Sequence, residues 1–178
     1  MRRLALICTV LVGLMAGPAA FAQVPPPPSD NPNDVLPDAM PWDVPYGETI
    51  NSETAKKVAG AAVAEATKRN WKLCIAIVAP SGDLVYFERM DNCQFASIAI
   101  SQHKARTSAK YRRPTLAFET AFGKGHYFSY LSTLDDIIAS RGGNPLIVGG
   151  KLIGAIGVSG GTGSQDEAAS QAGVASLK

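Results

Sequence analysis

The stretch that decides the fold of this chain is Gly142–Lys178, which reads GGNPLIVGGKLIGAIGVSGGTGSQDEAASQAGVASLK. It contains two apolar, strand-like runs, Pro145–Val148 and Lys151–Val158, joined by Gly149-Gly150. A two-residue glycine connection between such runs predicts a β-hairpin, because the tight hairpin turns need residues with positive φ. We therefore expect an antiparallel pair of strands at this end of the chain.

A helix is expected to follow the second of these strands. Ser164 and Glu167 have capping-box spacing, so each can satisfy a backbone amide at the start of an alanine-rich helix from Gln165 to about Leu177. The glycines just before this helix could expose amides to an anion. The loop lacks the lysine and the spacing of a phosphate-binding loop, however, and acidic residues occupy the positive end of the helix. We interpret it as a turn with its own acidic cap.

The middle of the chain alternates between helical and extended patterns. The expected elements are a helix from Asn51 to about Arg69, strands at Trp71–Ala79 and Leu84–Met90, and helices at Phe95–Arg112 and Thr115–Gly123. The first strand is apolar on both faces, which favours a central strand covered on both sides. The segment Gly125–Arg141 has no decided structure, and its acid pair Asp135-Asp136 is interpreted as a helix N-terminus. The order predicts an α/β protein of the α+β type, with helices packed on an antiparallel sheet.

The first 22 residues predict a secretory signal peptide. Arg2 and Arg3 precede the apolar run Leu4–Ala16, and a small-x-small cleavage site ends at Ala22. The apolar run is too short to span a bilayer as a helix. We therefore expect a periplasmic or secreted protein.

A Pro-rich acidic linker is predicted at residues 23–47, before a domain at residues 48–178. The proline run Pro25–Pro28 favours a polyproline II conformation, although Trp42 and Tyr46 could anchor the linker onto the domain. The whole chain carries 17 basic and 15 acidic residues, and the loss of Arg2 and Arg3 with the signal would make it neutral. Nucleic-acid binding needs a basic stripe with a matching motif, so we expect no such partner.

Two cysteines, Cys74 and Cys93, remain once the signal peptide and Cys8 are removed. An oxidising compartment favours a disulfide between them. The predicted hairpin places Cys74 opposite Arg89, however, and Cys93 lies several residues beyond that point. We therefore prefer two free or buried thiols to a disulfide.

His103, Arg106 and Lys110 have the spacing i, i+3 and i+7, which places them on one side of the predicted helix. An imidazole flanked by two cations suits a ligand with a metal and peripheral carboxylates, such as a porphyrin with propionates. The alternative is a solvated helix face with an incidental histidine. His126 lies in a loop rich in aromatic residues and is the second candidate metal ligand.

Four segments carry a resemblance to a known family. They are AKKVAGAAVAEA at residues 55–66, PSGDLVYFERMD at 80–91, ASIAISQHKARTSAKYRRPT at 96–115, and GGNPLIVGGKLIGAIGVSGGTGSQDEAASQAG at 142–173. Together they resemble the GlcG/HbpS-like haem-binding family and are similar to the C-terminal domain of PduO-type proteins. The resemblance implies a profilin-like α/β/α fold with a five-stranded antiparallel sheet, a tendency to form homo-oligomers, and haem or another tetrapyrrole as ligand.

The resemblance also implies a place for the ligand and a kind of partner. The basic segment KART falls at Lys104–Thr107, beside His103. Exported HbpS-type members act as accessory sensors next to a membrane kinase. The candidate cofactor-binding residues are His103, Lys104, Arg106, Thr107 and Lys110, and the candidate metal ligands are His103 and His126.

Two further functions stay open. A small-molecule enzyme or metabolite-binding module could use the same pocket, with Arg106 and Arg112 holding the carboxylate of an organic acid. Nucleophilic catalysis finds little support, because the sequence around Ser159 lacks the glycine–x–serine–x–glycine elbow. A structural homo-oligomer, with an apolar sheet face as its subunit interface, is the third alternative.

Overall fold

The structure, a computed structural model, describes residues 30–178. The elements are η1 (Pro32–Asp34), α1 (Ser52–Lys68), β1 (Cys74–Val78), β2 (Leu84–Arg89), α2 (Ala96–Tyr111), α3 (Thr115–Phe122), η2 (His126–Thr133), β3 (Gly143–Val148), β4 (Lys151–Ser159) and α4 (Gly163–Ala175). Asn31–Lys178 form one compact unit. The predicted signal peptide and the first part of the predicted linker lie outside the described residues. No helix within residues 30–178 is both long and apolar enough to cross a membrane.

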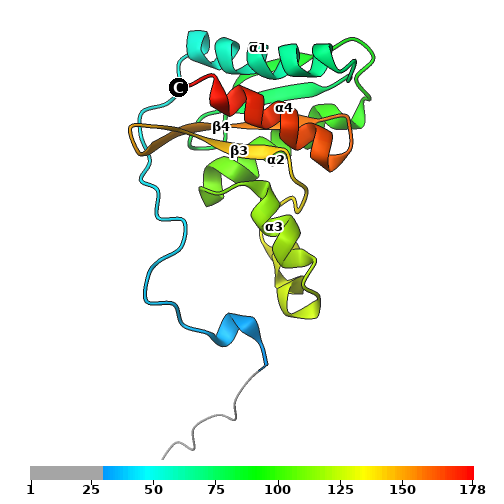
Figure 1. The fold of residues 1–178 in the computed structure, drawn as a ribbon. Helices are drawn as coiled ribbons and strands as arrows, with labels where there is room; N and C mark the ends of the chain where they lie inside the picture. The colour runs from blue at the N-terminus through cyan, green and yellow to red at the C-terminus, as the bar shows by residue number, and fades with distance from the viewer. Residues whose placement is uncertain (1–29) are drawn as a thin grey trace, which may run out of the picture. The chain divides into compact units, whose positions relative to one another are not determined.

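The four strands form one antiparallel sheet in the order β2-β1-β4-β3, with helices on both faces (Figure 1). The predicted α+β class is confirmed, but the expectation of five strands is wrong for the described part of the chain. The only pairing beyond the four strands there is an isolated bridge between Tyr46 and Leu152. Pro45 accepts a hydrogen bond from the Leu152 amide but has no amide to donate, so this pairing does not extend towards the N-terminus.

Both predicted hairpins are confirmed. Gly149 and Gly150 have φ values of 56° and 76°, the conformation that a type I′ turn needs between β3 and β4. In the other hairpin, Cys74 pairs with Arg89, as the sequence predicted. Each turn therefore sets the pairing of its own hairpin, whereas the central pairing of β1 with β4 joins strands that are distant in the sequence.

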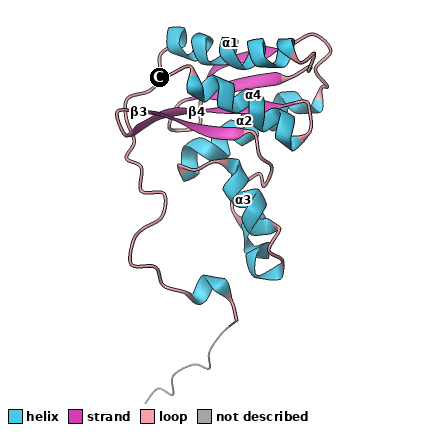
Figure 2. Ribbon diagram, in the orientation of Figure 1, coloured by secondary structure: helices cyan, strands magenta, loops and turns pink. Residues whose placement is uncertain are grey.

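The two faces of the sheet are covered by different helices, α1 and α4 on one side and α2 on the other (Figure 2). Alternate residues of β1 divide between these layers, as expected for a central strand. Ile75 and Ile77 join the larger cluster with α1 and α4, whereas Ala76 and Val78 pack with small residues of α2. The core beneath α2 is therefore thin.

The helix α2 lies unusually close to the sheet because glycines face it. A Cβ atom on Gly157 would collide with the Ser101 carbonyl oxygen and the Ala105 backbone. A Cβ on Gly143 would lie 2.5 Å from the Lys104 carbonyl oxygen. Close contact between backbones therefore fixes which side of α2 faces the sheet.

The helix α4 begins two residues before the predicted start. Its N-cap is Thr162, whose side chain accepts from the Gln165 amide, while Gln165 accepts from the Thr162 amide at 2.8 Å. The predicted Ser164–Glu167 capping box is therefore wrong. Glu167 instead accepts hydrogen bonds from the Gly142 amide and the Asn144 side chain, so it joins α4 to the start of β3.

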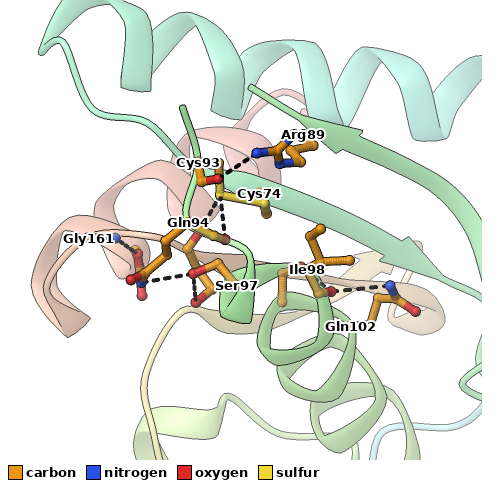
Figure 3. The surroundings of a disulfide bond; sticks show 11 residues. Cys74, Arg89, Cys93, Gln94, Ser97, Ile98, Gln102 and Gly161 are labelled. Carbon is orange, nitrogen blue, oxygen red and sulfur yellow. Dashed lines mark hydrogen bonds between the residues drawn. A yellow bond between two sulfur atoms is a disulfide. The ribbon is translucent and has the colours of Figure 1, made fainter. Parts of the chain in front are cut away.

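Cys74 and Cys93 form a disulfide, with their Cα atoms 6.1 Å apart (Figure 3). The preference for two thiols is therefore wrong. The chain reverses directly after β2, where Asn92 has a φ of 64° and the Cys93 amide donates to the Met90 carbonyl. The side chain of Arg89 donates to the Cys93 carbonyl at 3.0 Å. This tight turn returns Cys93 to the start of β1.

The last residues of the predicted linker are attached to the end of α2. The Arg112 guanidinium lies over the Tyr46 ring at 5.5 Å and donates to the Val44 carbonyl, while Arg113 lies over Trp42 at 5.6 Å. Both aromatic residues therefore anchor the chain just before α1.

Candidate functional site

The predicted side of α2 exists as a partly exposed surface formed by His103, Arg106 and Lys110, which we call the basic face. The side chains of Arg106 and Lys110 are 38% and 42% exposed. His103 is partly buried. Because the opposite side of α2 is pressed against glycines of the sheet, these longer side chains can only project outward.

The carboxylate of Asp136 lies against the basic face. It pairs with Lys110 through a short contact, and its other oxygen is 3.9 Å from the Arg106 Nε atom. The hydrogen bond from Lys110 holds the pKa of Asp136 below its ordinary value. The interpretation of Asp135-Asp136 as a helix N-terminus is wrong, since both follow η2 in a turn where Asp136 has a φ of 57°.

The residues around Asp136 form what we call the latch segment, residues 134–139. Its backbone is fastened to α2 by Thr107, whose hydroxyl donates to the Asp136 carbonyl at 2.6 Å and accepts from the Ile138 amide at 3.1 Å. The Tyr111 hydroxyl donates to the Asp135 carbonyl at 2.7 Å. Thr107 is buried, and its side chain is engaged by the latch segment.

Lys104 points away from the basic face into the interior. Its ammonium donates to the Asp166 carboxylate at 2.8 Å, and Lys104 is 1% exposed. Burial raises the pKa of Asp166, an effect that Lys104 opposes. The KART segment is therefore divided, with Lys104 and Thr107 bonded inside the protein and Arg106 facing outward.

The environment of His103 favours its neutral form. Partial burial lowers the pKa of His103, the positive charge of Arg106 lowers it further, and the negative charge of Asp136 acts in the opposite direction. A neutral imidazole is the form that binds a metal. His103 can therefore act as a metal ligand without first releasing the proton of an imidazolium.

His126 lies at the start of η2 and is exposed. Its ring contacts Tyr127, with the ring centroids 4.0 Å apart. Among the described residues, no hydrogen bond or ring contact joins it to His103, and no cluster of three or more histidine, cysteine or acidic residues is suited to a metal ion. The structure does not bring the two histidines into contact.

Two hollows share residues with these elements. A groove of about 340 Å³ is lined by Tyr46, Pro80, Ser81 and Lys110. A second hollow, of about 250 Å³, is mostly apolar and is lined by Phe122, Leu131, Ser132, Ile137, Ile138 and Ala139. The first therefore touches the basic face directly, whereas the latch segment forms one wall of the second.

Arg112 does not share a face with Arg106 in the way that the organic-acid alternative requires. It ends α2 in the left-handed conformation, with a φ of 54°. Its guanidinium donates to the Val44 carbonyl, lies over the Tyr46 ring and pairs with the Asp43 carboxylate at 3.6 Å. Arg112 therefore anchors the segment before α1.

Comparison with known proteins gives the chain its family. The family model described as haem degrading protein HbpS-like matches residues 50–175. This chain belongs to the HbpS-like family. Protein GlcG of Escherichia coli K12 is 38% identical over 110 residues, which cover 62% of this chain and 81% of GlcG. An uncharacterised 15.0 kDa protein of Citrobacter freundii, from the dhaT–dhaS intergenic region, is 38% identical over 120 residues, 66% of this chain and 84% of its own length.

Solved structures share the HbpS-like fold. Klebsiella pneumoniae ORFY has a TM-score of 0.70 and 28% identity, covering 80% of this chain and 97% of its own. A double mutant of Streptomyces reticuli HbpS has a TM-score of 0.69 and 26% identity, covering 81% and 97%. PduOC, solved as a complex with haem, shares the fold with a TM-score of 0.67 at 24% identity, covering 72% and 94%. The resemblance seen in the sequence is confirmed.

Proposed function

We propose that this HbpS-like protein is an exported haem- or tetrapyrrole-binding protein that holds its ligand at the basic face. The observation that carries the proposal is the position of His103, a partly buried imidazole with a lowered pKa, beside two cations on the same side of α2. The family description, which names haem degradation, supports it. The haem complex of PduOC, a protein of the same fold, is consistent with it.

The chemistry of these residues fits the group. When bound, haem supplies an iron centre and two propionate carboxylates. His103 would hold the iron, and Arg106 and Lys110 would hold the carboxylates. Lys104 would contribute indirectly, since its bond to Asp166 fixes α2 to α4. Thr107 lies on the same helix with its hydroxyl bonded to the latch segment, so it could reach a ligand only where that segment moves away. His126 is the second candidate for the iron.

Export is part of the proposal. The signal peptide predicted at residues 1–22 is its main support, and the Cys74–Cys93 disulfide is consistent with it because disulfides persist in oxidising compartments. We also propose that the protein forms homo-oligomers and that a membrane sensor is its partner. Light scattering coupled to size exclusion tests the first, and co-purification from solubilised membranes tests the second.

Titration of the mature protein with hemin tests the proposed ligand. We expect a saturable shift of the Soret band with one hemin per chain. His103→Ala should change the band position and weaken binding at least about tenfold, the order expected for loss of one strong interaction. His126→Ala asks whether the second histidine contributes.

The control for the charge effect is a cation on a different helix. Arg106→Gln should weaken hemin binding, whereas Arg69→Gln should not, because Arg69 belongs to α1 and pairs with Glu65. An absorbance change that does not saturate with hemin, and that is the same in wild type and in both histidine variants, would contradict the haem proposal.

A second candidate function is binding of a small organic acid, favoured by the carboxylate of Asp136 beside Arg106 and Lys110. The face accepts a carboxylate within the protein itself. Native mass spectrometry of the purified protein separates the two functions. A colourless protein that retains an organic acid, and loses it in Arg106→Gln, would favour this reading over haem.

A further inference from the structure

The latch segment is attached to α2 by a small number of polar contacts. Two are the hydrogen bonds of the Thr107 hydroxyl, one is the hydrogen bond from Tyr111, and the rest involve the Asp136 carboxylate. The ion pairs of Asp136 join partly exposed side chains, and such pairs exchange readily with water. The segment is therefore held locally, and its release need not disturb the sheet.

Asp136 occupies the position that an external carboxylate would take. One of its carboxylate oxygens pairs with Lys110 and the other lies 3.9 Å from the Arg106 Nε atom. The carboxylate of a ligand would contact the basic face in the same way. Asp136 also has a positive φ of 57°, a conformation that costs a residue with a side chain some energy. Release of the segment would therefore remove a local cost as well as free two cations.

The latch segment contacts apolar surface as well as α2. Ile137 and Ile138 line the hollow of about 250 Å³ shared with Phe122 and Leu131. The backbone of Ile138 is bonded to Thr107 on α2, one turn after His103. Movement of this one segment would therefore change the apolar hollow and the basic face together.

We propose that Asp136 is a built-in competitor for the carboxylates of the ligand, and that a flat apolar ligand bearing carboxylates binds by displacing Asp136 and the latch segment. This inference rests on the proposed function. It makes Asp136 the residue that sets specificity, since a ligand without carboxylates gains nothing from the cations that it uncovers. The apparent affinity is then the intrinsic affinity multiplied by the fraction of molecules in which the latch segment is open.

Hemin titrations of wild type, Asp136→Asn and Asp135→Asn test this competition. The Asp136→Asn change keeps the shape of the side chain but removes its charge, and should tighten hemin binding about fivefold. Asp135→Asn makes the same change of charge one residue away. Because Asp135 contacts α2 through its backbone carbonyl, that variant should bind hemin as wild type does.

Hemin dimethyl ester, which lacks the carboxylates, gives the second arm. The gain of Asp136→Asn should disappear with the ester, and an equal gain with both ligands would overturn the competition. Hydrogen exchange of wild type gives the third arm, because hemin should speed exchange of the Ile138 amide as it leaves Thr107. Slower or unchanged exchange there would overturn displacement of the latch segment.

The outcomes separate this inference from the proposed function. If wild type binds hemin and Asp136→Asn binds it equally, the inference is overturned and the function stands. If none of the three proteins binds hemin saturably, the function fails and the inference fails with it.

Discussion

The Lys104 ammonium donates to the Asp166 carboxylate at 2.8 Å, with the two side chains only 2% and 4% exposed. This pair joins α2 to the first turn of α4, two helices that cover opposite faces of the sheet. The other carboxylate oxygen of Asp166 accepts from the Gly161 amide at 2.9 Å. A buried pair of this kind matters most when one partner is removed, because a charge is then left buried and unpaired.

Replacement of Lys104 by methionine should lower the free energy of unfolding by about 3–5 kcal/mol, the usual cost of breaking a buried ion pair. The double variant Lys104→Met/Asp166→Leu should recover much of this loss, since no charge remains. Urea denaturation of the wild type and of the two variants measures these free energies. As a control, Arg69→Met breaks an exposed pair with Glu65 and should cost less than about 1 kcal/mol.

The loss in Lys104→Met should also depend on pH. Burial already raises the pKa of Asp166, and without Lys104 only the hydrogen bond from the Gly161 amide opposes this effect. A carboxyl whose pKa is higher in the folded state binds its proton more tightly there, so the free energy of unfolding falls as pH rises from the unfolded value of about 3.9. We expect a smaller deficit near pH 4 than at pH 7. A deficit that is constant over this range would contradict the assignment.

Reduction of the Cys74–Cys93 disulfide should lower the free energy of unfolding by about 3 kcal/mol, the effect of closing a loop of this size in the unfolded chain. The two cysteines are 19 residues apart. Thermal unfolding with and without reductant measures the loss, and the double variant Cys74→Ala/Cys93→Ala should not respond to reductant. A thiol assay that finds Cys74 and Cys93 free in the native protein, purified without reductant, would refute the bond.

Gly157→Ala should destabilise the protein by about 3 kcal/mol or more, because the new methyl group meets the backbone of α2 rather than a flexible side chain. Gly60→Ala is the matched control. It lies in the interior of α1 with nothing within 4 Å of the added carbon, and should gain about 0.5–1 kcal/mol from helix propensity. Chemical denaturation should show a lower free energy of unfolding for Gly157→Ala and a higher one for Gly60→Ala. Small and equal changes in the two variants would contradict the close packing of α2 on the sheet.

The His103 imidazole should titrate below its ordinary pKa of 6.5 in an NMR titration. A histidine with a lowered folded pKa binds its proton more weakly when folded, so its contribution to stability is lost as pH falls from 6.5 towards the folded pKa. The effect should be small because the ring is only partly buried. Hemin binding should persist below pH 6.5 and decline as His103 becomes protonated. A pKa above 6.5 would remove this argument for a metal ligand.

Local signals made the hairpins and most helix positions predictable. The Gly149-Gly150 turn and the Asn51 cap act within a few residues of themselves, so the sequence contains all that determines them. The start of α4 was predicted wrongly because the sequence contains two overlapping capping boxes, Thr162–Gln165 and Ser164–Glu167. In the structure Glu167 is bonded to Gly142 and Asn144 instead, and local sequence does not show that contact. The disulfide was missed because a single positive φ at Asn92 redirects the chain.

The candidate site was only half predictable. Helical spacing correctly placed His103, Arg106 and Lys110 on one side of α2. It could not show that Lys104 is buried, because its partner Asp166 lies 62 residues further along the chain. Nor could it bring Asp136 to the basic face, since that contact depends on a turn after η2 with no strong local pattern.

Because α2 lies so close to the sheet, its positions differ in the size of side chain that they accept. Where α2 faces Gly157, only small residues such as Ser101 and Ala105 fit, because a larger side chain there would lift the helix from the sheet. The outer side has no such limit. Relatives could therefore exchange residues at 103, 106 and 110 and acquire a different ligand while the scaffold stays the same. The fold can be inherited independently of what it binds.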